Sequence, residues 1–254
     1  MTHASESQHW YTQAGEPCYE IKGKPATLRH ARTMGLVPGV STILQMEAKP
    51  QLTNWLVDQA LLSALTLPRL DGETDDAFIV RAKEDSKQQA KRAAEKGKRI
   101  HAAIEANFAY GTLDLDYARE VTAVRDWIHA RYGGDGWRAE CSFAHPLGYG
   151  GKADLLGLGI VADIKTKDFG PEKEGIDLAW PEHIMQLAAY SHGFGFEKPD
   201  CVNIFVSTRI PGLVRIREWD NAEIAEGLEA FKLLLRLYKI RKKFDPSFST
   251  KEAA

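Results

Sequence analysis

The chain has 254 residues, 44% of them hydrophobic, and a formal net charge of −2 at pH 7. That length and apolar content allow one large domain with a sizeable core, and no run of about 18 apolar residues predicts a membrane span. Because the overall charge is nearly neutral, binding of nucleic acid would have to come from local basic patches. The three cysteines lie far apart without a CxxC pair, which argues against a disulfide framework, a zinc ribbon or an iron–sulfur cluster.

The N-terminal part combines a polar, aromatic segment with two helix signals. Its first ten residues lack the charged-then-apolar order of a signal peptide, so we expect a cytoplasmic protein that is nucleoid-associated in use. We expect residues 1–34 to be partly loose. A Gly/Pro turn leads into Ser41 and Thr42, either of which would cap a helix whose positive end suits a phosphate; an ordinary cap is the simpler interpretation. Apolar spacing over residues 52–65 predicts a packed helix with Trp55 in the core.

A long helix predicted over residues 76–109 carries a basic stripe. Between residues 81 and 99, eight Lys or Arg residues stand against three acids, a local balance of +5. Such a stripe can follow a phosphate backbone, although a charged run is more often a solvated helix face. Gly97 costs roughly 1 kcal/mol relative to Ala inside a helix, so it marks a break or a close approach of the backbone. His101 and Glu105 share one face at i, i+4, a pairing that by itself indicates no metal site.

A further amphipathic helix is predicted over residues 115–132, followed by a strand over residues 137–145. Glu140 in that strand either orients a ligand, pairs with a base or has no special role. The next stretch, residues 148–167, is the most informative in the chain. Two apolar runs there flank the turn signal Gly157-Leu158-Gly159, which predicts an antiparallel hairpin.

The predicted hairpin brings charges together. Side chains alternate between the two faces of a strand, so Asp163 and Lys165 point the same way, and a two-residue loop would set Asp154 opposite Asp163 on that face. Opposed carboxylates on an apolar hairpin are destabilising unless a positive group lies between them. A hard divalent cation would supply that charge, with Lys165 beside it to stabilise developing charge or position a water. A surface hairpin with three solvated charges is the alternative, and the D-x9-D-x-K pattern alone does not decide.

The C-terminal part is predicted to add a helix, a second hairpin and a closing helix. Pro181 opens the first helix, on which Gln186 and Tyr190 share a face at i, i+4. Strands are predicted over residues 200–208 and 213–219. A capping-box-like start at Asp220 begins the last helix.

In chain order, the motifs Gly97-x3-His101, Gly151-x2-Asp154, Asp163-Ile-Lys165-Thr and Gln186-x3-Tyr190 resemble the RecB-like branch of the PD-(D/E)XK nuclease superfamily. The resemblance covers about residues 35–240, and PGVSTIL with the Trp55 helix is similar to the stand-alone exonucleases of that branch. It implies an α/β fold: a central mixed β-sheet flanked by helices, a restriction-endonuclease-like core with a helical N-terminal extension. The single nuclease domain would span residues 35–250, with a mainly helical part over 35–132 that carries His101 and a sheet core over 133–250.

The resemblance also implies roles for individual residues. The side chains of His101, Asp154 and Asp163 and the carbonyl of Ile164 match metal-ligand positions for one or two Mg²⁺ or Mn²⁺ ions. Lys165 matches the catalytic lysine, and Lys152 stands where many relatives carry Arg, which keeps the charge without a bidentate phosphate contact. Gln186 and Tyr190 match the motif that supports the site and contacts DNA. The remaining predicted nucleic-acid contacts are Ser41, Thr42, Lys91, Arg92 and Lys98.

The function implied is hydrolysis of phosphodiester bonds in DNA, exonucleolytic on single strands or duplex ends, because a helical extension could form a channel for a strand. One alternative is a DNA-binding or recombination partner that keeps the fold without cutting; the intact His/Asp/Asp/Lys set counts against it. Another is an endonuclease selective for a structure or sequence. DNA is the expected partner, together with a recombination or single-strand-binding protein, and no membrane. Cleavage polarity, strand preference and oligomeric state do not follow from the sequence.

Overall fold

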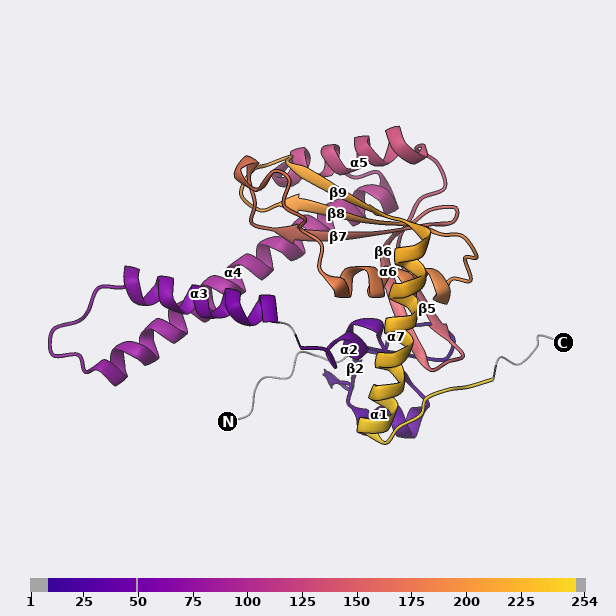
Figure 1. Cartoon of the computed structure of the whole chain (residues 1–254), viewed down its shortest axis with the longest axis horizontal. Helices are drawn as coiled ribbons and strands as arrows, with labels where there is room; N and C mark the ends of the chain where they lie inside the picture. The colour runs from indigo at the N-terminus through magenta and orange to yellow at the C-terminus, as the bar shows by residue number, and fades with distance from the viewer. Residues whose placement is uncertain (1–8, 49, 250–254) are drawn as a thin grey trace.

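The computed structural model describes residues 9–48 and 50–249. A central sheet is covered by helices on both faces, and a helical arm projects from it (Figure 1). The helices are α1 (Leu28–Met34), α2 (Val40–Leu44), α3 (Pro50–Thr66), α4 (Asp75–Tyr110), α5 (Ala118–Tyr132), α6 (Pro181–Gly193) and α7 (Asn221–Lys242), with 3-10 turns η1 (Leu115–Tyr117) and η2 (Pro171–Lys173). The strands are β1 (Trp10–Tyr11), β2 (Glu20–Ile21), β3 (Lys24–Pro25), β4 (Val37–Pro38), β5 (Arg138–His145), β6 (Tyr149–Leu156), β7 (Ile160–Lys167), β8 (Asp200–Ser207) and β9 (Val214–Trp219).

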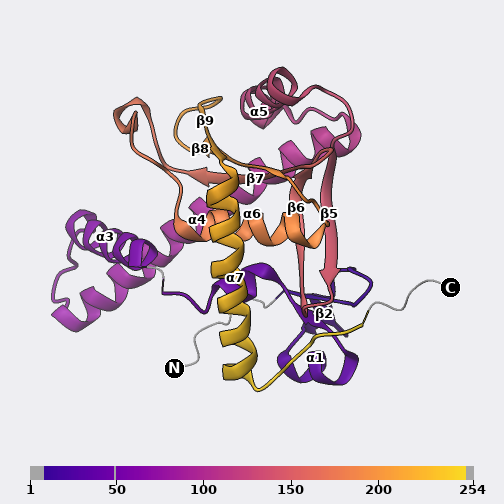
Figure 2. The same cartoon turned by 45° about the vertical axis from the view of Figure 1, so that its right-hand side comes forward.

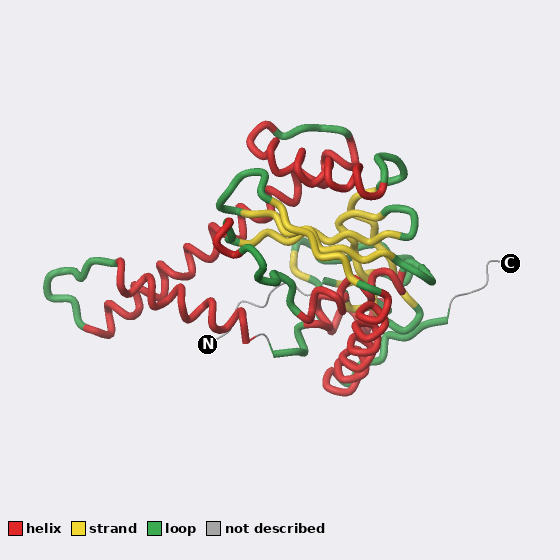
Figure 3. Tube along the Cα trace, turned by 45° about the horizontal axis from the view of Figure 1, so that its top comes forward, coloured by secondary structure: helices red, strands yellow, loops and turns green. Residues whose placement is uncertain are grey.

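The five-stranded sheet has the order β5-β6-β7-β8-β9. All neighbouring pairs are antiparallel except β7 and β8, which run parallel. A parallel pair needs a crossover connection, and α6 supplies it. The α/β class with a mixed sheet flanked by helices, predicted from the sequence, is therefore confirmed (Figure 3).

Each face of the sheet buries its own apolar cluster. On one face α4 and α5 pack through residues such as Ile100, Ile104 and Val124. On the other face α2, α6 and α7 pack through residues such as Leu187 and Phe231 (Figure 2). Because β7 and β8 are covered on both faces, their sequences are nearly continuous apolar runs, and the polar residues within those runs need partners.

The arm consists of α3 and the first half of α4, which lie against each other away from the sheet (Figure 1). The core position expected for Trp55 is wrong: its side chain is 39% exposed, and Leu61 and Leu65 are exposed to 58% and 82%. The helical period was read correctly, but α3 is apolar around most of its circumference and only α4 covers it. Periodicity alone does not reveal how many neighbours a helix has.

The described part of the N-terminal segment is held to the domain. Trp10, Ala31 and Leu36 form a small buried cluster that Phe244 joins after α7. Residues 9–34 are thus more ordered than the expected loose segment, because Trp10 supplies a large apolar surface for burial. The remaining residues of that prediction, 1–8, lie outside the described residues.

The expected cap at Ser41 or Thr42 is wrong. Helix α2 begins at Val40, its N-cap is Gly39, and no side chain caps it. The Thr42 hydroxyl instead accepts a hydrogen bond from the backbone N–H of His9 at 3.1 Å, and Ser41 Oγ lies 3.5 Å from His9 Nδ1. Both hydroxyls therefore tie the N-terminal strand to the domain.

Other local predictions hold. The start of α7 at Asp220 is a capping box with Glu223. All three cysteines are free. Among the helices of residues 9–48 and 50–249, none combines the length and apolar character needed to cross a membrane.

Candidate active site

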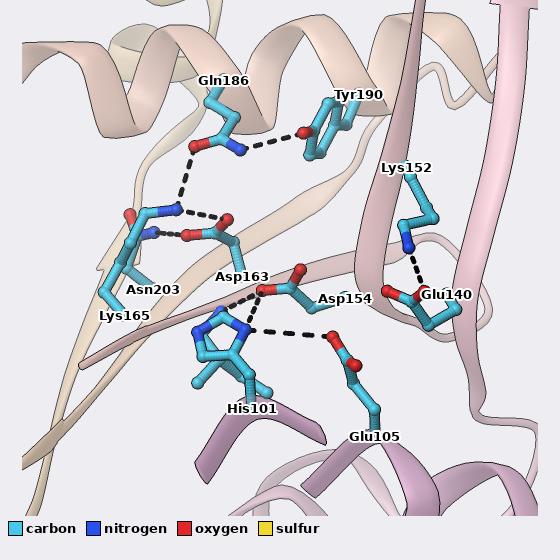
Figure 4. A network of polar contacts seen from close by, with 11 residues as sticks. His101, Glu105, Glu140, Lys152, Asp154, Asp163, Lys165, Gln186, Tyr190 and Asn203 are labelled. Atoms are coloured by element: carbon cyan, nitrogen blue, oxygen red, sulfur yellow. Dashed lines mark hydrogen bonds and ion pairs between the residues drawn. The ribbon is translucent and has the colours of Figure 1, made fainter. Parts of the chain in front are cut away.

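The hairpin of β6 and β7 has the predicted register and opens at its charged end. Leu155 pairs with Ala162 and Leu156 with Val161, and the Gly157 N–H donates to the Ile160 carbonyl at 2.9 Å, which sets Asp154 level with Asp163. Beyond Leu155 the Ile164 N–H donates to Asp154 Oδ2 at 2.7 Å. The Asp154 side chain thus lies in the opening between the strands instead of on a face shared with Asp163. The two carboxylates still converge there (Figure 4).

Asp163 is buried on β7 and both of its oxygens are engaged. Lys165 Nζ donates to Oδ1 at 2.7 Å, and Asn203 Nδ2 donates to Oδ2 at 2.7 Å. Asn203 reaches it because the parallel register places it beside Asp163 on β8, and Trp219 Nε1 donates to Asn203 Oδ1 at 2.8 Å. Sequence reasoning missed Asn203 and Trp219; a polar residue inside the apolar run of β8 was the available signal.

Helix α6 holds Lys165 from above in Figure 4. Lys165 Nζ donates to Gln186 Oε1 at 3.1 Å, and Gln186 Nε2 donates to the Tyr190 hydroxyl at 2.9 Å. The predicted pairing of Gln186 with Tyr190 is therefore confirmed. A Cβ on Gly151 would lie 2.5 Å from Tyr190 Cε1, so glycine in that motif lets the ring cross β6 closely.

Helix α4 brings His101 to the opening between β6 and β7. His101 Nδ1 lies 3.8 Å from Asp154 Oδ2 and 3.9 Å from Glu105 Oε1. The helix runs unbroken through Gly97, and a Cβ there would lie 2.5 Å from Thr166 Oγ1. Of the two expectations for Gly97, close approach is the correct one: it seats α4 on β7 one turn before His101.

The charges of the cluster shift each other's pKa. Burial and the neighbouring Asp163 carboxylate raise the pKa of Asp154 to about 6. Burial opposes the charge of Lys165, but the carboxylates of Asp163 and Asp154 outweigh it and raise the pKa of Lys165. Burial likewise opposes the charge of His101, and Glu105 and Asp154 reverse the effect and raise its pKa. The site is therefore rich in carboxylates that lack a compensating cation, with one ammonium fixed beside them.

Three side chains are grouped as a metal site would require. One ligand atom each from His101, Glu105 and Asp154 lies within 4.8 Å of the others. Carboxylate oxygens suit Mg²⁺ and Mn²⁺, and the imidazole favours Mn²⁺ of the two. Asp163 is not in this group, because its oxygens face Lys165 and Asn203. Glu105, which the sequence showed only as a helical neighbour of His101, takes the third place.

An open cleft of about 390 Å³ lies beside this cluster between α4 and the sheet. Glu140 and Lys152 form a close ion pair at its wall (Figure 4). Glu140 has φ 57°, a left-handed conformation rare for a residue inside a strand, at the position opposite Asp154. Of the predicted nucleic-acid contacts, Lys98 and Lys152 line the cleft. Lys91 and Arg92 are exposed farther out on α4.

The helix, two strands and helix that carry His101, Asp154, Asp163 with Lys165, and Gln186 with Tyr190 confirm, at the level of the fold, the PD-(D/E)XK-like arrangement predicted from the sequence. No protein-family model matches the chain, and no curated protein matches it significantly.

Solved structures with a similar trace include exonucleases. The alkaline exonuclease LHK-Exo from Laribacter hongkongensis aligns with a TM-score of 0.36 and 20% identity over 57% of this chain and 81% of its own. LHK-Exo in complex with dAMP gives a TM-score of 0.32 and 17% identity over 73% and 88%. A proposed exonuclease from Eubacterium rectale gives 0.37 and 14% over 73% and 68%. All three TM-scores are low, so these similarities by themselves assign no activity to this chain.

Proposed function

We propose that this chain is a divalent-metal-dependent nuclease that hydrolyses phosphodiester bonds in DNA. The observation that carries the proposal is the placement of a protonated Lys165 next to the group formed by His101, Glu105 and Asp154. A cation held by carboxylates next to a fixed ammonium is what cleavage of a phosphodiester needs, since negative charge builds on the phosphate and on the attacking and leaving oxygens.

The residues divide into two groups by role. His101, Glu105 and Asp154 would hold the ion, and Asp163 and the Ile164 carbonyl would complete the ligand set implied by the resemblance. When bound, Mg²⁺ or Mn²⁺ supplies a Lewis acid that polarises the phosphate and lowers the pKa of a bound water.

Lys165 acts as a charge and not as a base. Because its pKa is raised, it keeps its proton and donates hydrogen bonds to the attacking water or to a phosphate oxygen. Asp163 and Gln186 fix the direction of its ammonium, and Tyr190 fixes Gln186 through the hydroxyl that accepts from the amide. In the resemblance Gln186 and Tyr190 also contact DNA, and Lys98 and Lys152 are placed to bind its phosphates.

We further propose an exonuclease that acts on single strands or on duplex ends, which rests on the sequence resemblance to stand-alone exonucleases. The test is incubation of the purified protein with linear and circular DNA, single-stranded and duplex, in Mg²⁺, Mn²⁺ or EDTA. Metal-dependent loss of linear DNA with circles left intact is the expected result. Nicked or linearised circles would indicate an endonuclease, and binding without any metal-dependent product would indicate a non-cutting DNA-binding protein.

A matched variant identifies the protein itself as the source of any products. Lys165→Ala removes the ammonium and should leave no cleavage above the level seen in EDTA, because the negative charge at the phosphate then lacks its fixed partner. Cleavage by this variant at the wild-type rate would overturn the role of the site.

A further inference from the structure

Four lysines form a row along one face of α4. The helix is continuous from Asp75 to Tyr110, so each residue is rotated by about 100° from the one before it. Lys83, Lys87 and Lys91 follow one another at intervals of four residues, and Lys98 continues the strip. By the same rotation His101 and Glu105 belong to this strip, which spans about 80° of the circumference. The row therefore runs along the arm and ends at the cation site.

No acidic residue interrupts the row. Glu84, Asp85 and Glu95 all fall outside the strip, although Glu95 at its border lies 4.0 Å from Lys91. The four lysines are exposed. The other basic residues of the stripe point elsewhere: Arg81 pairs with Glu73 and Lys96 donates to the Thr208 carbonyl. Folding thus sorts the mixed stripe of the sequence into a purely cationic ridge and a structural remainder.

The ridge is continuous with the cleft of the site. Lys98 lines that cleft together with His101, Glu105 and Lys152. From Lys83 to His101 the helix rises by about 27 Å, which corresponds to no more than about eight nucleotides at 3.4 Å or more per phosphate. A strand whose end lies in the cleft is long enough to contact all four lysines only if it extends by that many nucleotides.

We propose that Lys83, Lys87, Lys91 and Lys98 hold the phosphate backbone of one DNA strand on its way to the cation site, without regard to its sequence. This rests on the proposed nuclease function. Lysine ammonium groups are mobile point charges that neutralise phosphates and carry no base-specific geometry. A single file of such charges on a straight helix matches one strand, whose backbone lies within reach of one row.

The test replaces the two lysines farthest from the site, Lys83→Gln with Lys87→Gln. The matched control carries Arg99→Gln with Lys198→Gln, two exposed cations outside the row with the same change in charge. Binding of a single-stranded oligonucleotide of about 30 nucleotides is measured in EDTA across salt concentrations. Each lost phosphate contact lowers the log–log salt slope by about 0.7, so the slope should fall by about 1.4, and wild type should lose about sevenfold more affinity than the variant between 50 and 200 mM salt.

Cleavage of two substrates supplies the second measurement. An oligonucleotide of about four nucleotides ends before Lys87, so the lysine variant should cleave it at the wild-type rate, whereas cleavage of the long strand at low concentration should slow about tenfold. Equal salt slopes and equal long-strand rates for the lysine variant and the control would overturn the proposal, as would the same loss with the short substrate. If wild type cleaves nothing in Mg²⁺ or Mn²⁺ but the slope still falls, the nuclease function fails and the strand-binding row stands. An effect seen with blunt duplex alone would overturn the assignment to a single strand.

Discussion

Replacing Asp154 by asparagine should make the metal-free protein more stable near neutral pH while it removes the cation site. Asp154 and Asp163 converge where β6 and β7 part, and only Lys165 offsets their charge directly. An asparagine keeps the oxygen that accepts the Ile164 N–H at 2.7 Å, so the variant removes a charge without removing that hydrogen bond.

The magnitude follows from the pKa of the Asp154 carboxyl, which burial and the Asp163 charge raise from 3.8 to about 6 in the folded protein. Because the folded state binds this proton more tightly than the unfolded chain, the free energy of unfolding falls as pH rises from about 4 through about 6. A shift of roughly two pKa units corresponds to about 3 kcal/mol. Asparagine does not titrate, so the variant should gain up to that amount above pH 6 and nothing near pH 4.

Urea unfolding in EDTA at pH 4 and at pH 7.5 measures this difference. Addition of Mn²⁺ at pH 7.5 should then raise the stability of wild type by mass action and leave the variant unchanged. A variant that is less stable than wild type in EDTA at pH 7.5, or equally stabilised by Mn²⁺, would show that Asp154 is not a strained carboxylate awaiting a cation.

Two further predictions concern the neighbours of Asp154. Asp163→Ala should abolish both metal binding and cleavage, whereas Lys165→Ala should keep much of the metal affinity, measured by titration calorimetry, and lose turnover; equal loss of metal from both variants would contradict these roles. Gly97→Ala should destabilise the protein by about 1 kcal/mol, since a Cβ would lie 2.5 Å from Thr166 Oγ1 and overpacking outweighs the helix propensity gained. In a Thr166→Ala background, where only an ordinary contact with Cβ remains, the same change should stabilise by about 1 kcal/mol, and an unchanged sign in urea unfolding would refute the close-approach role of Gly97.

The sequence by itself determined the features that depend on neighbours along the chain. The helical and strand periods, the capping box at Asp220, the register of the β6–β7 hairpin and the pairing of Gln186 with Tyr190 all lie within a few residues of their partners. Such contacts are fixed by the geometry of one helix turn or one tight turn, so a pattern of residue types is enough to predict them.

Tertiary structure decided the features that join distant segments. Asn203 reaches Asp163 across 40 residues because β8 lies parallel to β7, and Thr42 hydrogen bonds with His9 across 33 residues instead of capping its helix. Packing also decided that α3 is exposed, that Glu105 replaces Asp163 beside His101, and that four lysines of a mixed stripe share the face of α4 that leads to the site. The energy of these contacts depends on which surfaces meet, and the local pattern of residues carries no record of that choice.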